Sequence, residues 1–145
     1  MSQANVDLVR RLQPGPHVDL AAMFRSDDAF RELAEANAPL LDSDFEGVFG
    51  VEEAPESSYV GIDGLRAVWI DWLAPWATYR TEIEELIDAG ERVVVLVRDF
   101  GRREQSVQEV ELITAAVWTV RDGKIARADF YRDRPSAFKA VGLEG

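Results

Sequence analysis

The sequence predicts an α+β fold in which N-terminal helices pack on one face of a mostly antiparallel sheet. Two observations lead to this class. Apolar residues recur at helical spacing in the first third of the chain, whereas the second half consists of strand-like stretches joined by short turns. No crossover helix separates these later strands, which excludes a parallel Rossmann-type sheet. The length of 145 residues is that of one domain, expected to span residues 1–145.

Three helical stretches are expected before residue 40. The first contains the apolar positions of residues 6–12 and ends at Pro14-Gly15-Pro16, because proline and glycine interrupt helices. The second begins near residues 20–24. Ser26 or Asp27 caps the third, since short polar side chains accept hydrogen bonds from the free N–H groups of a first helical turn.

A strand at residues 43–50 and an acidic loop at residues 51–58 are expected next. The loop Gly61–Gly64 then precedes a helix with apolar residues at helical spacing on one face: Leu65, Trp69, Trp72, Leu73 and Trp76. Pro75 is expected to end the regular helix near Ala74.

The rest of the chain is expected to form strands at residues 79–87, 92–100, 106–120 and 125–133. Asp122-Gly123 favours a tight hairpin between the last two, because it supplies the positive φ angles that such a turn needs. A short helix at residues 135–141 closes the chain, and Gly142 ends it.

Two of these strands are apolar on both faces, at Val93–Val97 and at Leu112–Val117. An antiparallel sheet usually exposes one face to water and therefore alternates. If helices cover one face, the other also needs a cover. We expect a second copy of the chain there, and so a homodimer.

Composition and charge exclude several kinds of protein. The net charge is −11 and the pI is about 4.5, which disfavours binding to nucleic acids and to anionic membranes. The chain has no cysteine, so disulfides and thiol catalysis are excluded. Residues 1–12 lack the apolar core of a signal peptide, and no apolar run is long enough for a membrane span. A cytoplasmic location is expected.

The C-terminal half contains a recognisable series of motifs. The hairpin Ala115–Ile125 is followed by Phe130–Arg134 and Ala140–Leu143, and the segments Gly61–Gly64 and Ile87–Val95 precede them. These motifs resemble the SnoaL-like family of the nuclear transport factor 2-like (NTF2-like), or ketosteroid isomerase-like, superfamily. The first 60 residues match that family only in the layout of their elements.

The resemblance implies a cone-shaped fold, in which a strongly curved, mostly antiparallel sheet wraps around the helices and encloses an apolar pocket. It also implies frequent dimers through the outer sheet face. It does not imply one activity, because the superfamily contains isomerases, dehydratases, hydrolases, polyketide cyclases and binding modules.

The known catalytic sets of this superfamily match the sequence poorly. The N-terminal helices lack the tyrosine of ketosteroid isomerase-like enzymes, and the two histidines of scytalone dehydratase-like enzymes are reduced to His17. Epoxide hydrolase-like members carry Arg-x-Asp on one strand. Here Arg98 and Asp99 are adjacent, so they point to opposite faces. The second acidic residue of those hydrolases aligns with Phe130. Asp129 is one residue away and therefore points to the opposite face of the strand.

Polyketide cyclase-like members use one aspartate that faces the pocket, and Asp99, Asp129 and Asp44 are the candidates. We favour Asp99 as the catalytic acid/base, because it shares a face with Val93, Val95 and Val97. A carboxyl group on an apolar face has a raised pKa, which suits a general base. The alternative is an exposed aspartate at a strand end, paired with Arg98 or Arg102.

An aromatic group is expected to form the wall of a ligand pocket. Its members are Trp69, Trp72, Trp76, Tyr79, Trp118, Phe130 and Tyr131. Core packing is the alternative for the tryptophans, and Tyr131 fits either a ligand carbonyl or a subunit interface. Glu109 and Glu111 share a strand face and suit either an acid/base pair or ion pairs with arginines.

The sequence therefore leaves two functional hypotheses. The first is a cofactor-independent isomerase, cyclase or hydrolase that acts on a small apolar molecule through a pocket carboxylate. The second is a non-catalytic domain that binds a small molecule or another protein. No metal site and no organic cofactor are expected, and whether the chain is an enzyme stays open.

Overall fold

The computed structural model describes residues 3–49 and 58–143. Its strands are β1 (Leu41–Phe49), β2 (Ser58–Val60), β3 (Thr78–Ala89), β4 (Arg92–Arg102), β5 (Glu109–Arg121) and β6 (Lys124–Tyr131). Its helices are α1 (Gln3–Leu12), α2 (Leu20–Arg25), α3 (Asp27–Asn37), α4 (Gly61–Leu73) and α5 (Arg134–Ala140), and a short 3-10 turn covers Ala38–Leu40. Among the described residues, no helix is long and apolar enough to span a membrane.

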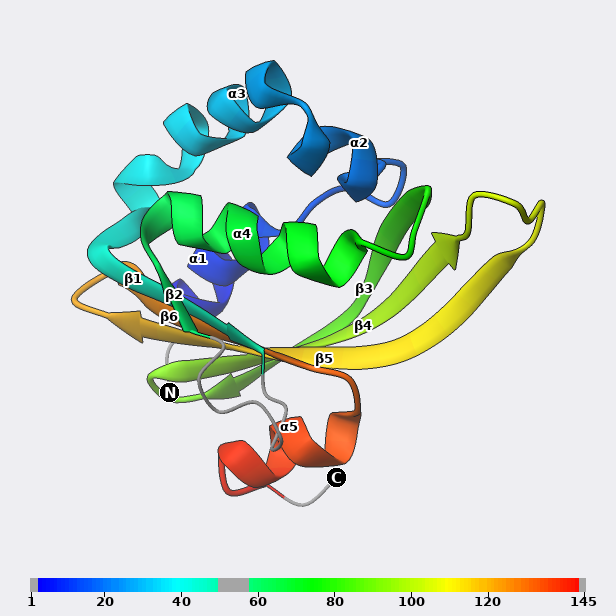
Figure 1. Cartoon of the computed structure of the whole chain (residues 1–145). Coiled ribbons are helices and arrows are strands. Elements are labelled where there is room, and N and C mark those ends of the chain that lie inside the picture. The colour runs from blue at the N-terminus through cyan, green and yellow to red at the C-terminus, as the bar shows by residue number, and fades with distance from the viewer. Residues whose placement is uncertain (1–2, 50–57, 144–145) are drawn as a thin grey trace.

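The six strands form one sheet in the order β2-β1-β6-β5-β4-β3. All neighbours are antiparallel except β1 and β6, which run parallel. Figure 1 shows α1 to α4 on one side of a curved sheet and α5 on the other. The predicted α+β class, with helices packed on a mostly antiparallel curved sheet, is confirmed.

A β-bulge interrupts the pairing of β3 with β4. The register shifts between Ile83 and Glu85, so that Thr81 rather than Glu82 lies opposite Asp99. A bulge increases the local twist of a strand, which fits the bend of β3 in Figure 1. It also decides which side chain meets Asp99.

Polar contacts fix the helical layer to the sheet. Asp19 caps α2 by accepting from the backbone N–H groups of Ala21 and Ala22, and the same oxygen accepts from Tyr79 N on β3 at 3.0 Å. Arg25 donates to the carbonyls of Leu73, the last residue of α4, and of Trp76, in the turn beyond it, at 2.9 and 2.8 Å. Helix α2 is thereby fixed against both β3 and the end of α4.

The observed boundaries differ from the predicted ones by more than two residues at three places. Ser26 caps α3 as expected. However, α4 begins at Gly61 and ends at Leu73, so Trp76 lies in the turn beyond the helix. Ser58–Val60 form a strand that we assigned to a loop, and the rest of that acidic loop, 51–57, lies outside the described residues. Strand β5 begins at Glu109 rather than at residue 106.

The outer face of the sheet is covered in part by α5. Val94, Leu96, Ala115 and Val117 are buried there together with Ala137 of that helix. We had expected a second subunit to cover these strands, but the chain's own last helix buries these four positions. The two-faced apolar pattern is therefore explained without a partner at α5, and the homodimer stays a prediction.

Candidate functional site

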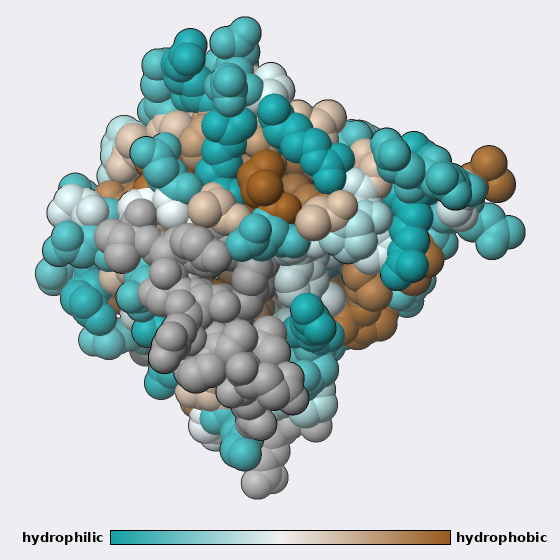
Figure 2. Space-filling view, in the orientation of Figure 1, coloured by the Kyte–Doolittle hydropathy of each residue, from teal (hydrophilic) through white to brown (hydrophobic). Residues whose placement is uncertain are grey.

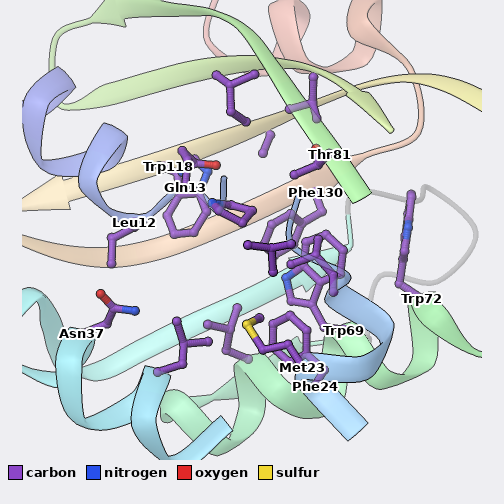
Figure 3. Close-up of a pocket in the computed structure, with 18 of the residues that line it drawn as sticks. Leu12, Gln13, Met23, Phe24, Asn37, Trp69, Trp72, Thr81, Trp118 and Phe130 are labelled. Carbon is purple, nitrogen blue, oxygen red and sulfur yellow. The ribbon is translucent and has the colours of Figure 1, made fainter. Parts of the chain in front are cut away.

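A cavity of about 370 Å³ lies between the helical layer and the inner face of the sheet. Figure 3 shows its wall, to which α1, α2, α3, α4 and the sheet contribute. Apolar side chains dominate it, including Leu12, Met23, Phe24, Leu65 and Val97. The polar exceptions on the sheet are Thr81, Asp99 and Thr114. Such an apolar hollow with a few convergent polar groups is typical of small-molecule sites.

Asp99 is the buried carboxyl group of this wall and is 4% exposed. Thr81 donates to its Oδ1 at 2.6 Å. Tyr79 and Thr114 donate to its Oδ2 at 2.5 and 3.1 Å. Among the described residues, no arginine or lysine forms an ion pair with it. Neutral hydroxyl groups therefore hold this carboxyl group.

Burial raises the pKa of Asp99 above the ordinary value of an aspartate, although the hydrogen bonds from Thr81, Tyr79 and Thr114 lower the pKa in part. Burial, with added repulsion from Asp99, also raises the pKa of Tyr79, so its phenol stays protonated. The raised pKa of Asp99 brings a proton-exchanging group closer to neutrality, which is what general acid/base chemistry requires.

A second shell of hydrogen bonds reaches Asp99 through Tyr79. The indole Nε1–H of Trp72 donates to the Tyr79 hydroxyl oxygen at 2.8 Å. Trp72 comes from α4, Tyr79 from β3 and Asp99 from β4, so three elements meet at this point. Asp19, which holds Tyr79 N, adds α2 to the same junction.

Aromatic rings form the centre of the cavity wall. Trp69 stacks on Phe24 with ring centroids 5.6 Å apart and meets Phe130 edge-on at 5.2 Å. Phe130 meets Trp118 edge-on at 5.9 Å. In Figure 3 these rings lie together, and Trp72 stands apart at one side. Of the aromatic residues predicted as a pocket wall, Trp69, Trp72, Trp118 and Phe130 line this one cavity.

Trp118 has one unsatisfied polar atom. Its side chain is 7% exposed, and its indole Nε1 has no hydrogen-bond partner among the described residues. A buried N–H without a partner lowers stability, and such groups are uncommon in folded proteins. A ligand with a hydrogen-bond acceptor near this wall would satisfy it.

Two of the predicted pocket residues do not line the cavity, and a third has contacts on both faces of the sheet. Trp76 is not part of the lining; its ring packs on Gly101, where an added Cβ would come within 2.5 Å of the ring. Tyr79 does not line the cavity either, but its hydroxyl holds Asp99. Tyr131 touches the cavity wall, yet it packs against the outer-face cluster under α5, opposite Ala115.

The other candidate acids do not face the cavity. Glu109 bonds to Arg80, and Glu111 pairs with Arg98, on the outer face of the sheet. Asp129 is held by Arg127, while Asp44 and His17 are exposed. Among the described residues, no group of three potential metal ligands occurs. Within the described part of the chain, Asp99 is thus the acid that the cavity offers.

The sequence did not indicate two hydroxyl groups of the site, those of Thr81 and Thr114. Thr81 and Thr114 were not candidates, because a threonine in a strand carries no signal of its own. Pairing of β3 with β4 by simple counting from the Ala89–Arg92 turn would have placed Glu82 opposite Asp99, and only the bulge brings Thr81 there. Trp72 and Tyr79 were candidates, but as pocket wall rather than as hydrogen-bond partners of a carboxyl group.

Comparisons with known proteins agree with this architecture. The model of the SnoaL-like domain matches residues 25–128, which is more than half of the chain. The chain belongs to the SnoaL-like family. No curated protein matches it significantly.

Several solved structures share the SnoaL-like fold of this chain. TerC, co-crystallised with polyporic acid, has a TM-score of 0.64 and 19% identity over 97% of this chain and 99% of its own. A putative SnoaL-like polyketide cyclase from Jannaschia sp. CCS1 has a TM-score of 0.63 and 19% identity, over 100% and 98%. A hypothetical protein with a ketosteroid isomerase-like fold from Catenulispora acidiphila DSM 44928, in complex with trimethylamine, has a TM-score of 0.55 and 17% identity, over 90% and 95%. At these identities the likeness establishes the fold alone.

Proposed function

We propose that this SnoaL-like protein binds a small, uncharged and largely apolar carbonyl compound in the cavity and that Asp99 moves a proton next to the carbonyl group. The observation that carries the proposal is a buried carboxyl group, raised in pKa, in the wall of an apolar cavity of about 370 Å³. This volume suits a compound of a few fused or linked rings.

The walls support a flat, apolar ligand. Trp69, Trp118 and Phe130 present ring surfaces to the hollow. Rings bury much apolar area and favour stacked or edge-on contact with other rings. The small molecules in the structures of TerC and of the Catenulispora protein support a ligand-binding role for the same fold.

The electrostatics support an uncharged ligand. Asp99 accepts from three hydroxyl groups and forms no ion pair among the described residues, so a ligand anion beside Asp99 would be repelled; the cation of the cavity lining is Arg11, at the end of α1. In the proposed step, the Asp99 carboxylate takes a proton from the carbon next to the carbonyl. The electron pair of that C–H bond moves to the carbonyl, which becomes an enolate, and return of the proton to a second carbon completes an isomerisation.

Hydrolysis of an epoxide is the least supported of the family chemistries. Arg98 pairs with Glu84 and Glu111 on the outer face, so it cannot share the cavity with Asp99. An isomerase or a cyclase needs only the single proton-transferring carboxylate.

The second candidate is a non-catalytic binding domain. It is favoured by the hydrogen bonding of Asp99, whose two oxygens already accept from three hydroxyl groups. Such a carboxyl group can serve to connect β3, β4 and β5 without reacting.

Binding is tested with three probes of nearly equal shape: neutral β-tetralone, cationic aminotetralin and anionic tetralin carboxylate. The fluorescence of Trp69 and Trp118 reports occupancy of the cavity. We expect β-tetralone to bind and the carboxylate not to bind. Ala116→Leu, which adds bulk at the cavity wall, is expected to weaken binding, whereas Thr119→Leu on the outer face of β5 is not. Equal binding by both variants would contradict a ligand in this cavity.

Proton transfer is tested by the exchange of the enolisable protons of β-tetralone in deuterium oxide, followed by mass spectrometry. We expect Asp99→Asn to slow the protein-catalysed exchange by about a hundredfold, the usual contribution of a general base. Glu109→Gln, which changes a carboxylate of the outer face, is the matched control and should exchange as the wild type does. Binding without any catalysed exchange would overturn the catalytic proposal in favour of the binding domain.

We also propose a homodimer through the outer face of the sheet. Beside α5, this face presents Ile113, which is 43% exposed, and arginine–carboxylate pairs centred on Arg98 and Arg127. Sedimentation at micromolar concentration is expected to give a dimer that Ile113→Asp dissociates. A wild-type monomer would overturn this assignment.

A further inference from the structure

Tyr79 does not line the cavity but donates a hydrogen bond to Asp99, which does, and Trp72, itself a lining residue, donates to the Tyr79 hydroxyl. We infer that Tyr79, held by Trp72, is a positioning residue that occupies Oδ2 of Asp99 and leaves Oδ1 as the atom that exchanges a proton with the ligand. This inference rests on the proposed function, because it assigns roles within the same site.

The direction of each hydrogen bond follows from the donor inventory. An indole Nε1–H can only donate, so the Tyr79 oxygen accepts the 2.8 Å bond from Trp72. The phenol keeps its proton, because burial and the nearby Asp99 raise its pKa. That proton is directed at Asp99 Oδ2, 2.5 Å away. Trp72 thus fixes the orientation of the Tyr79 hydroxyl.

The two carboxyl oxygens differ as a result. Oδ2 accepts from both Tyr79 and Thr114, which uses its two lone pairs. Among the described residues, Oδ1 accepts from Thr81 alone and so keeps one lone pair. A proton that binds to Asp99 therefore binds to Oδ1, because protonation of Oδ2 would displace one of the two hydrogen bonds that this oxygen accepts.

The surroundings prevent this arrangement from relaxing. Tyr79 is fully buried, its ring contacts Trp69 and Trp76, and its backbone N–H is bound by Asp19. The charged and titratable groups that face Tyr79 and Trp72 in the described chain are Asp99, Asp19 at the backbone N–H of Tyr79, and Arg132, whose guanidinium lies over the Trp72 ring at 5.8 Å. In the described chain, Asp99 accepts the hydrogen bond that the Tyr79 hydroxyl donates.

This arrangement predicts a graded response of Asp99 to two substitutions. Tyr79→Phe removes a hydrogen bond to the charged form and should raise the pKa of Asp99 by about one unit, as expected for the loss of a bond to an ionised group. Trp72→Phe leaves the Tyr79 hydroxyl in place but removes the donor that polarises it. It should raise the pKa of Asp99 in the same direction and by less.

The experiment is a pH titration of the carboxyl carbons by NMR on protein labelled with carbon-13 at aspartate, without ligand. The Asp99 signal is identified by its absence in Asp99→Asn. Trp76→Phe is the matched control, since Trp76 also packs on the Tyr79 ring, at 5.9 Å between centroids, without a hydrogen bond to its hydroxyl. Thermal unfolding of each variant shows that it is folded.

The expected order of the Asp99 pKa is Tyr79→Phe highest, Trp72→Phe next, and Trp76→Phe equal to the wild type. An unchanged pKa in Tyr79→Phe, or an equal shift in Trp76→Phe and Trp72→Phe, would overturn the inference. If Tyr79→Phe does not fold, Trp72→Phe against Trp76→Phe still decides. Because no ligand is present, the result is independent of the proposed function. If Asp99→Asn loses the proton exchange of β-tetralone but the pKa of Asp99 is the same in all three variants, the positioning role is refuted and the proposed function is not.

Discussion

Asp99 and Arg98 are neighbours on β4, yet they lie in opposite environments. Asp99 is buried in the cavity wall among hydroxyl groups, whereas Arg98 lies on the outer face between Glu84 and Glu111, with 46% of its side chain exposed. The carboxylates of the outer face are bound by arginines in contact with water. The partners of a carboxyl group and its exposure, rather than the residue type, therefore decide whether it stays an inert anion.

The surface reflects the same division. Figure 2 shows mostly hydrophilic residues on the side it presents, with apolar residues in small groups between them. The outer-face carboxylates belong to this solvated surface, where ion pairs contribute little to stability. The inner face is apolar, and the same charge there is costly unless it is hydrogen-bonded or protonated.

The free energy of unfolding should depend on pH in opposite directions for the carboxyl groups of the two faces. This is the largest difference that we expect between the faces. Burial raises the pKa of Asp99 above its value of about 4 in an unfolded chain, so the folded state holds the proton more tightly. Its contribution to stability is present at low pH and is lost as the pH rises from about 4 through the raised pKa. The slope approaches about 1.4 kcal/mol per pH unit within that window.

Glu109 behaves in the opposite way, because the hydrogen bond from Arg80 lowers its pKa. Its contribution is present above the unfolded pKa of a glutamate and is lost as the pH falls through the lowered pKa. Chemical unfolding of the wild type, Asp99→Asn and Glu109→Gln at a series of pH values tests both signs. If the stability difference between the wild type and Asp99→Asn is independent of pH, Asp99 does not have a raised pKa.

Gly101→Ala should destabilise the inner face by about 1–3 kcal/mol, the usual cost of overpacking. The added Cβ would lie 2.5 to 2.8 Å from three ring carbons of Trp76, and that ring is held between Gly101 and Tyr79. The free energy of unfolding in urea measures the effect. The cost should shrink in a Trp76→Leu background, and a cost that stays the same would show that the close contact is not its source.

Asp19→Ala should lower the free energy of unfolding by about 1–2 kcal/mol, the upper part of the range for a helix cap. Its carboxylate serves the N-terminus of α2 and the backbone N–H of Tyr79 at once. Ser26→Ala, which removes the cap of α3 alone, is the control and should cost less. Equal losses would mean that the bond to β3 contributes nothing measurable.

Glu111→Gln should have the smallest effect, about 0–1 kcal/mol and weaker at high salt. Its partner Arg98 is half exposed and keeps Glu84. Thermal unfolding at low and high ionic strength measures it. A loss as large as that of Gly101→Ala would break the contrast between a solvated outer face and a packed inner one.

Local patterns in the sequence were sufficient for several parts of the structure. Apolar spacing located α1, α3 and α4, Ser26 located the start of α3, and Asp122-Gly123 located the β5–β6 hairpin, where both residues have positive φ. These features depend on neighbours a few residues apart, which is why a single sequence reveals them. Alternation along β4 likewise placed Asp99 on the same face as Val97, away from Arg98.

Only the tertiary structure decided what surrounds Asp99. The bulge in β3 places Thr81 instead of Glu82 opposite Asp99. Because α4 ends at Leu73, Trp76 packs on Gly101. Helix α5 covers strands for which the sequence predicts a partner subunit. Each of these contacts joins residues far apart in the chain. Each depends on strand register or helix packing, which leaves little signal in any short stretch of sequence. Sequence alone therefore determined the elements, their order and the face on which Asp99 lies, whereas the contacts that tune its carboxyl group arose from long-range packing.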